Sequence, residues 1–251
     1  MPNDPQLPAT FNFILQVERF YAALIECAIP PIETGDEPSL GGQLFYASEL
    51  NCDGRALLVA ANIAGAASLT ATADKATQKQ AVRDGVIDFL VTDLDEALRI
   101  LKNQLRKREP VAVCIAEAPE TIEREMIERG VQPNLLGSSL VPADPEPGQL
   151  LVSWSVTEKP SLWLPKLDAM AMDCLAPNAN SARRWLRLVP RYMGRLAQTV
   201  RLLRCDEPTA VRFLKRVESA ELGVFVEIQL RRGEDSIAYQ FAPPKRAESA
   251  S

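Results

Sequence analysis

Between Gln43 and Leu136 the sequence repeats one pattern, in which a short apolar segment is followed by an amphipathic one. Short apolar segments are typical of buried strands, and apolar residues spaced three or four apart are typical of helices. The expected strands are Gln43–Ser48, Ser68–Thr72, Val86–Val91, Val111–Ala116 and Leu135–Leu136, and the expected helices are 55–67, 75–84, 93–108 and 120–129. This alternation predicts an α/β fold, a Rossmann-like parallel sheet with helices on both faces.

The clearest helix start in the chain is at Asp93. Glu96 follows three residues later, the spacing of a capping box. Leucines then recur at helical spacing and predict a buried stripe, which consists of Leu94, Leu98, Leu101 and Leu105.

The segments on either side of this pattern differ from it. A helix with one apolar stripe is expected before it, from Phe13 to Cys27, with Phe13, Val17, Phe20, Leu24 and Cys27 on the stripe. After the proline-rich segment 142–147, we expect strand 149–156, a helix over 180–204 that kinks or restarts at Pro190, helix 208–218, and a hairpin of 224–231 with 236–241. The expected organisation is an N-terminal helix and linker (1–41), a Rossmann domain (42–147), an α+β extension (148–243) and a disordered tail (244–251).

The chain contains no histidine. Catalysis by Ser-His-Asp or Cys-His pairs and zinc binding by an HExxH motif are therefore excluded. The five cysteines are scattered, which indicates reduced thiols rather than a disulfide framework, and we expect no metal site.

The net charge of −5 is unevenly distributed, because Lys and Arg are concentrated after Ser181 while the rest of the chain is acidic. No apolar run approaches the roughly 18 residues that span a bilayer, and the first ten residues lack the order of a secretion signal. We therefore expect a cytoplasmic protein that contacts neither membrane nor nucleic acid. A protein partner and a homo-oligomer both remain open.

In a Rossmann fold, the loop after the first strand binds the pyrophosphate of the cofactor at a helix N-terminus. Glycines in this loop allow the backbone to approach the phosphate groups closely. In this chain the loop is 48–54, with Gly54 as its one glycine, a cysteine at Cys52, and carboxylates at Glu49 and Asp53. The acidic residue that binds ribose is expected at the end of the second strand, where this chain has Thr72. No cofactor is expected at these degenerate positions, and no catalytic residue can be assigned.

Residues from about Gly42 to Pro145 resemble the NAD-binding domain of urocanase (urocanate hydratase). The matching segments are 60–66 (AANIAGA, family AATMAGA), 93–98 (DLDEAL), 129–135 (RGVQPNL, family RGVxPD) and 144–145 (DP), in register without gaps. The resemblance implies a fold that binds NAD⁺ tightly and uses it as an electrophile.

The chain also departs from that family. The family sequence GLGGMGGAQP falls on 48–57, and its acidic ribose ligand falls on Thr72. The family segment DQTSAHDP becomes SSLVPADP at 138–145, and no counterpart of the family's separate core domain is recognisable. The resemblance therefore implies a retained scaffold and a lost site, so we do not expect an active urocanase.

Three hypotheses follow for the function. The first is a non-catalytic interaction or regulatory module that has lost NAD binding. The second is a binding domain for a different small ligand at the crevice of the sheet. The third is an enzyme of altered chemistry related to urocanate hydratase, centred on Cys52, Asp53 or Glu49.

Overall fold

The computed structural model describes residues 9–28, 37–233 and 235–243, which form two compact units. The first unit extends through Asp144 and includes Arg187–Leu196; the second comprises Pro145–Leu186 and the chain from Ala197 onward. The expected tail (244–251) and part of the expected N-terminal linker lie outside the described residues.

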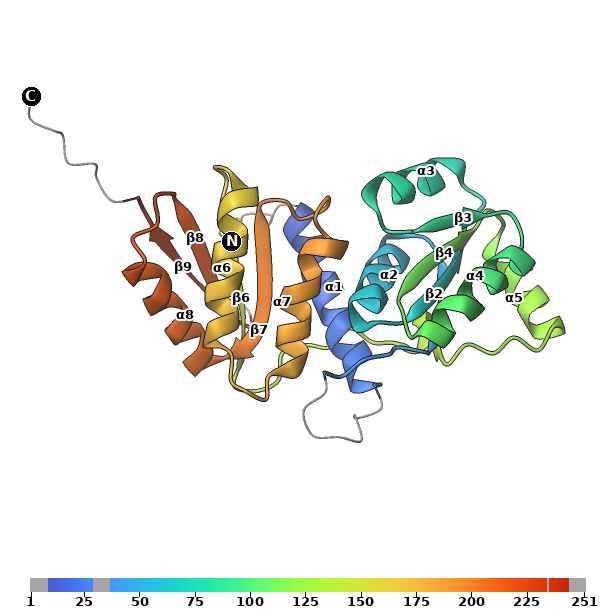
Figure 1. Ribbon diagram of the computed structural model, residues 1–251, viewed down its shortest axis with the longest axis horizontal. Helices are drawn as coiled ribbons and strands as arrows, with labels where there is room; N and C mark the ends of the chain where they lie inside the picture. The colour runs from blue at the N-terminus through green and yellow to red at the C-terminus, as the bar shows by residue number, and fades with distance from the viewer. Residues whose placement is uncertain (1–8, 29–36, 234, 244–251) are drawn as a thin grey trace, which may run out of the picture. The chain divides into compact units, whose positions relative to one another are not determined.

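The first unit contains a five-stranded parallel sheet in the order β3-β4-β2-β1-β5 (Figure 1). Its strands are β1 (Leu44–Glu49), β2 (Ala67–Ala71), β3 (Phe89–Val91), β4 (Val111–Ile115) and β5 (Leu135–Leu136). Its helices are α1 (Ala9–Glu26), α2 (Cys52–Ala64), α3 (Lys75–Asp84), α4 (Leu94–Lys107) and α5 (Pro119–Glu128). The predicted Rossmann-like α/β fold is confirmed.

The helices cover both faces of this sheet. On one face, side chains of α4 and α5, among them Leu101 and Ile122, share a buried apolar cluster with Leu69 and Val113 of the strands. The small residues of α2 pack against β1 and β2 on the other face, and α1 packs against α2. Coverage on both sides explains why the central strands β2 and β4 are buried along their whole length.

Capping residues fix where these helices begin and end. Asp93 accepts a hydrogen bond from the Glu96 backbone N–H (2.9 Å), as the capping-box spacing predicts. Gly65 and Gly85 end α2 and α3 in the left-handed conformation that favours glycine. On the predicted stripe of α1, Val17, Phe20 and Leu24 are buried, whereas the prediction was wrong for Cys27, which lies past the helix end and is exposed.

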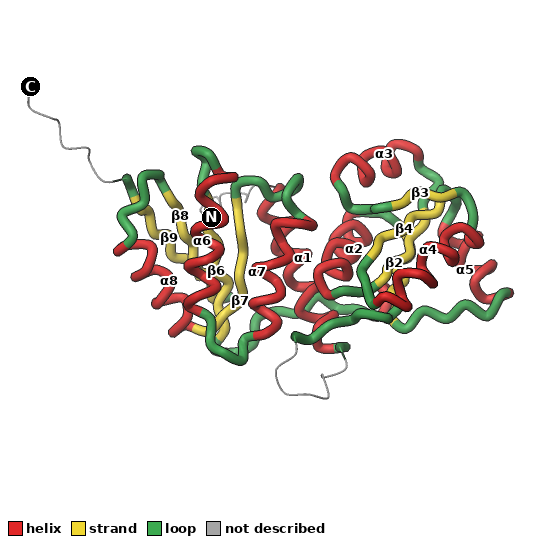
Figure 2. The backbone as a smooth tube through the Cα atoms, viewed as in Figure 1, coloured by secondary structure: helices red, strands yellow, loops and turns green. Residues whose placement is uncertain are grey.

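The chain from α5 to the second unit is mostly loop and contains only β5 and a short 3-10 helix, η1 (Gly137–Ser139) (Figure 2). The second unit contains an antiparallel sheet in the order β7-β6-β8-β9. Its elements are β6 (Gln149–Ser155), α6 (Pro160–Cys174), α7 (Asn180–Tyr192, of which the part from Arg187 belongs to the first unit), β7 (Val200–Asp206), α8 (Glu207–Ser219), β8 (Val226–Arg232) and β9 (Asp235–Phe241).

The predicted α+β character of this region is confirmed, but the helix predicted over 180–204 is wrong beyond Tyr192. α7 contains Pro190 without ending there, and the chain then turns through Gly194 into strand β7. Leu202 and Leu203 are both buried in β7, one on each face of the sheet, so they lack the polar alternation that would have marked a strand. Within the described residues, no helix has both the length and the apolar character that crossing a bilayer requires.

Candidate functional site

The candidate site lies at the carboxyl end of the parallel sheet, where β1 leads into α2. β1 lies between β2 and β5, so the chain proceeds from β1 to one side and later returns to the other. Ligands of doubly wound sheets bind in the crevice where the strand order reverses in this way. The predicted loop 48–54 lies at this position.

Two hollows flank the loop. The first, which we name the switch-point crevice, has a volume of about 400 Å³ and lies between β1, the segment after β5, and α1. The second, which we name the basic cavity, has a volume of about 830 Å³ and lies between the loop and α3. Asn51 lines both hollows.

Two positions at this loop suit glycine, one by its backbone conformation and one by its lack of space for a side chain, although only the second is a glycine. Ser48 has a φ of 61°, at a point where the register between β1 and β2 is interrupted. A Cβ added to Gly54 would lie 2.0 Å from the carbonyl oxygen of Glu49, so only glycine fits there. These residues occupy the first and last glycine positions of the family pattern.

Ser48 is held in this unusual conformation by hydrogen bonds. Its hydroxyl donates to Glu123 Oε1 on α5 (2.9 Å), and its carbonyl accepts from the Thr70 hydroxyl (2.8 Å). Tyr46 also donates to Glu123 Oε1 (3.2 Å). Burial, reinforced by the negative charge of Glu123, raises the pKa of Tyr46, which therefore remains a neutral donor.

The switch-point crevice contains the two carboxylates predicted from the sequence. Glu49 and Asp53 are exposed and line it. Asp53 Oδ1 accepts a hydrogen bond from Gln16 Nε2 of α1 (2.5 Å), and the Asn51 side chain caps α2 by accepting from the Gly54 backbone N–H (2.9 Å). The role of α1 was not predicted, because nothing in its sequence identifies the residues it faces across the fold.

The other two predicted positions, Thr72 and Cys52, lie on the side of the basic cavity. Thr72 follows the end of β2 and is only 6% exposed. Its hydroxyl accepts from the Asp74 backbone N–H (3.3 Å) and its carbonyl from Gln78 Nε2 (2.7 Å), so its polar groups stabilise the start of α3. Cys52 is the exposed first residue of α2 and lines the basic cavity. Within the described part of the chain, its sulfur has no hydrogen-bond partner.

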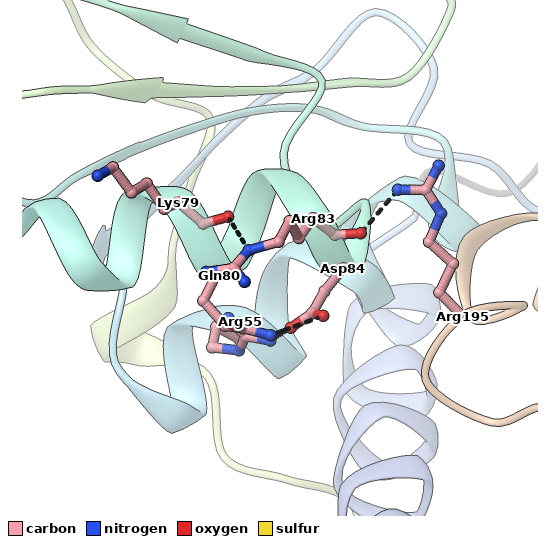
Figure 3. A network of polar contacts seen from close by, with 6 residues as sticks. All are labelled: Arg55, Lys79, Gln80, Arg83, Asp84 and Arg195. Carbon is pink, nitrogen blue, oxygen red and sulfur yellow. Dashed lines mark hydrogen bonds and ion pairs between the residues drawn. The ribbon is translucent and has the colours of Figure 1, made fainter.

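The basic cavity brings together four cationic side chains. Lys75, Lys79 and Arg83 recur every fourth residue, on one face of α3, and Arg55 extends from α2. Figure 3 shows Arg55 directed at Asp84, with which it forms an ion pair of 2.5 Å. The sequence analysis predicted 75–84 only as a helix, although the four-residue spacing of its cations is visible in the sequence.

Asp84 is also bonded to Gln80, whose amide donates to both carboxylate oxygens (2.9 and 3.0 Å). Burial opposes ionisation of Asp84, but the hydrogen bonds from Arg55 and Gln80 outweigh it and lower the pKa of the carboxyl group. At the C-terminus of α3, Arg195 donates to the carbonyl oxygen of Arg83 (2.7 Å) (Figure 3). A cation at this position also interacts favourably with the helix dipole.

Residues in a segment that resembles the family, 129–135, stabilise the scaffold. The Asn134 side chain accepts from the backbone N–H of Leu44 (2.8 Å), and the Asn134 backbone N–H donates back to the Leu44 carbonyl (2.8 Å). Gly130 follows α5 with a φ of 65°. Among the residues that the structure describes, no group of acidic or cysteine side chains could hold a metal ion.

The sheet order and the glycine-type loop after β1 define a Rossmann-like domain. Residues 21–163 match the urocanase family over its Rossmann-like domain. Because this match covers more than half of the chain, the protein belongs to the urocanase family. The match extends beyond Gly42–Pro145 at both ends, into α1 and α6.

Proposed function

We propose that this protein is a non-catalytic member of the urocanase family that has lost NAD binding and acts as an interaction or regulatory module. The observation that carries the proposal is the contact between Gln16 and Asp53, which fastens α1 against the loop where a pyrophosphate would rest.

The protein itself already provides a hydrogen-bond acceptor and a negative charge at the N-terminus of α2. The Asn51 side chain accepts a hydrogen bond from the Gly54 backbone N–H. Asp53 places a negative charge in the first turn of α2, where it interacts favourably with the helix dipole. A pyrophosphate brought to this position would meet Asp53 and Glu49 at short range and would be repelled. The residues present therefore do not fit NAD⁺ bound in the manner of a Rossmann fold.

The ribose position supports the same proposal. A carboxylate at the end of β2 would accept hydrogen bonds from ribose hydroxyls, but Thr72 is buried and bonded to α3. The next carboxylate along the chain, Asp74, accepts from the Ala76 and Thr77 backbone N–H groups (3.2 and 2.9 Å) and from the Thr77 hydroxyl (2.6 Å). Asp74 therefore serves as the N-cap of α3.

The test is a calorimetric titration of the full chain with NAD⁺, together with an assay of urocanate consumption in the presence of added NAD⁺. We expect a dissociation constant no better than about 1 mM, equivalent to about −4 kcal/mol, and no turnover. Replacing Ser48 and Asp53 together by glycine is expected to leave NAD⁺ binding weak, because the ribose contact is still missing. A micromolar dissociation constant for the unaltered protein, or turnover of urocanate, would contradict the proposal.

A further inference from the structure

The basic cavity differs in charge from the rest of the molecule. The chain has a net charge of −5, yet four of the ten described residues that line this cavity are Lys or Arg and none is Asp or Glu. Asp84 pairs with Arg55. Lys75 and Lys79 are exposed, and neither has an ion-pair partner among the described residues.

The arrangement of these cations disfavours the helix that carries them. Like charges four residues apart on a helix repel each other and destabilise it, and α3 carries three such residues in succession, Lys75, Lys79 and Arg83. An anion bound along this face would remove the repulsion. Local features that disfavour the fold without compensation are typical of functional sites.

The dimensions of the cavity indicate the class of ligand. With a rise of 1.5 Å per residue, the three cations of α3 extend over roughly 12 Å, more than one phosphate group spans. Asn51, Thr77 and Gln80 add neutral hydrogen-bonding groups, and no aromatic side chain occurs among the described lining residues. The volume of about 830 Å³ is within the range of small-molecule sites.

We infer that the basic cavity binds a small phosphate ester that carries at least two phosphate groups and is not a dinucleotide such as NAD⁺. Lys75, Lys79 and Arg83 contact the phosphate oxygens, and Arg55, braced by Asp84, forms the opposite wall. A hollow lined by four cations from two helices, Lys75, Lys79 and Arg83 of α3 and Arg55 of α2, suits a small molecule better than the extended backbone of a nucleic acid. This site lies on the other side of the loop from the switch-point crevice. The inference rests on the proposed function, for which the phosphate ester would be the regulatory ligand.

The experiment is calorimetric titration of the full chain with inorganic pyrophosphate, orthophosphate and a single-stranded oligonucleotide. We expect saturable one-to-one binding of pyrophosphate that is tighter than that of orthophosphate. The double variant Lys75→Gln/Lys79→Gln is expected to weaken pyrophosphate binding by roughly 100-fold, about tenfold for each charge-assisted hydrogen bond that the substitutions remove. The matched control Lys102→Gln/Lys107→Gln removes two exposed lysines of α4, and its affinity is expected to stay within about twofold of the unaltered protein.

Three results would overturn the inference: no binding of pyrophosphate, an equal loss in both double variants, or tighter binding of the oligonucleotide than of pyrophosphate. NAD⁺ is titrated in parallel. Micromolar NAD⁺ binding that the Lys75→Gln/Lys79→Gln change leaves intact would contradict the proposed function alone. Loss of pyrophosphate binding in the control would contradict this inference alone.

Discussion

Arg55 in α2 and Asp84 at the end of α3 form an ion pair of 2.5 Å whose two side chains are only 17% and 19% exposed. The pair joins α2 and α3, and residues of both helices line the basic cavity. It also neutralises one of the four cations there. Asp84 therefore stabilises the fold and at the same time reduces the positive charge available to an anion.

The Asp84→Asn variant separates these two effects. We expect it to lower the free energy of unfolding by about 1–2 kcal/mol, because a partly buried charged hydrogen bond is lost. The pKa of Asp84 is lowered in the folded protein, so the stability it contributes is present above the ordinary pKa of 3.8 and is lost as pH falls through the lower value. The same variant is expected to bind pyrophosphate more tightly, because Arg55 is freed.

Urea unfolding at neutral and acid pH measures the first effect, and titration with pyrophosphate measures the second. Glu128→Gln, which removes an exposed carboxylate of α5, is the matched control and is expected to change stability by less than about 0.5 kcal/mol. If Asp84→Asn left stability unaltered, the ion pair would not brace the two helices.

Substitutions at Ser48 test whether its left-handed backbone conformation is strained. An L-residue in the left-handed region costs roughly 1–2 kcal/mol, and Ser48 has a φ of 61°. Ser48→Gly and Ser48→Ala both lose the hydrogen bond to Glu123, but only glycine relieves the backbone cost. We expect the glycine variant to be the more stable by about 1 kcal/mol in chemical denaturation.

The same pair of substitutions at Ser155, in the extended strand β6, provides the control. There the alanine variant is expected to be the more stable, because glycine loses more conformational freedom on folding. An alanine variant at position 48 that matched or exceeded the glycine variant would show that the loop backbone is not strained.

The sequence was sufficient to predict the parallel sheet, because its strands and helices carry local start and stop residues. Asp93 and Gly85 are examples, and both act as caps in the structure. α6 was not predicted, because it has Pro165 in its interior and its apolar residues are not confined to one stripe. β7 was predicted as helix because one of its polar residues, Arg201, packs inside the second unit, and its burial depends on contacts distant in sequence.

The candidate site was predicted in part. The loop 48–54 could be located because it follows a recognisable first strand, and its single glycine, Gly54, could be read directly. The contact of Gln16 with Asp53 joins residues 37 positions apart, and only the folded chain brings them together. The cations of α3 share a face at four-residue spacing, but that they line a cavity depends on the position of α2.

Arg201 and Asp168 form a buried ion pair in the second unit. Arg201 Nε lies 3.2 Å from Asp168 Oδ2, and Trp154 donates to the other carboxylate oxygen (3.1 Å). Burial raises the pKa of Asp168, and the charge of Arg201 opposes that shift. We expect Arg201→Met to lower the free energy of unfolding by about 3–5 kcal/mol, because it leaves a buried carboxylate unpaired.

The stability of Arg201→Met is expected to improve as pH falls, because a carboxyl group with a raised pKa favours the folded state when protonated. The double variant Asp168→Leu/Arg201→Met is expected to be more stable than the single variant at neutral pH. Equal stability of the two at neutral pH would mean that the unpaired Asp168 carboxylate costs the folded protein no stability. Lys215→Gln, an exposed change on α8, is the control.

The two buried thiols of Cys114 and Cys205 are expected to make the stability of the fold depend on pH in the alkaline range. Burial raises the pKa of Cys114 to about 12 and that of Cys205 to about 12, from the ordinary value of 9.0. The stability these thiols contribute is fully present below pH 9 and is lost as pH rises toward 12, because the unfolded chain releases their protons first. Each thiol is expected to remove about 1.4 kcal/mol of stability per pH unit in that range.

Urea unfolding between pH 8 and about pH 10.5 measures this slope. Cys114→Ala is expected to make the slope shallower by the contribution of one thiol. Val113→Ala, a neighbouring buried residue of β4, is expected to lower stability at every pH and leave the slope intact. In the native protein, iodoacetamide is expected to label the exposed Cys27 and Cys52, and to reach Cys114 and Cys205 only after unfolding. Labelling of Cys114 at the rate of Cys52 in the native protein would show that β4 opens to solvent, and the alkaline slope would then have another origin.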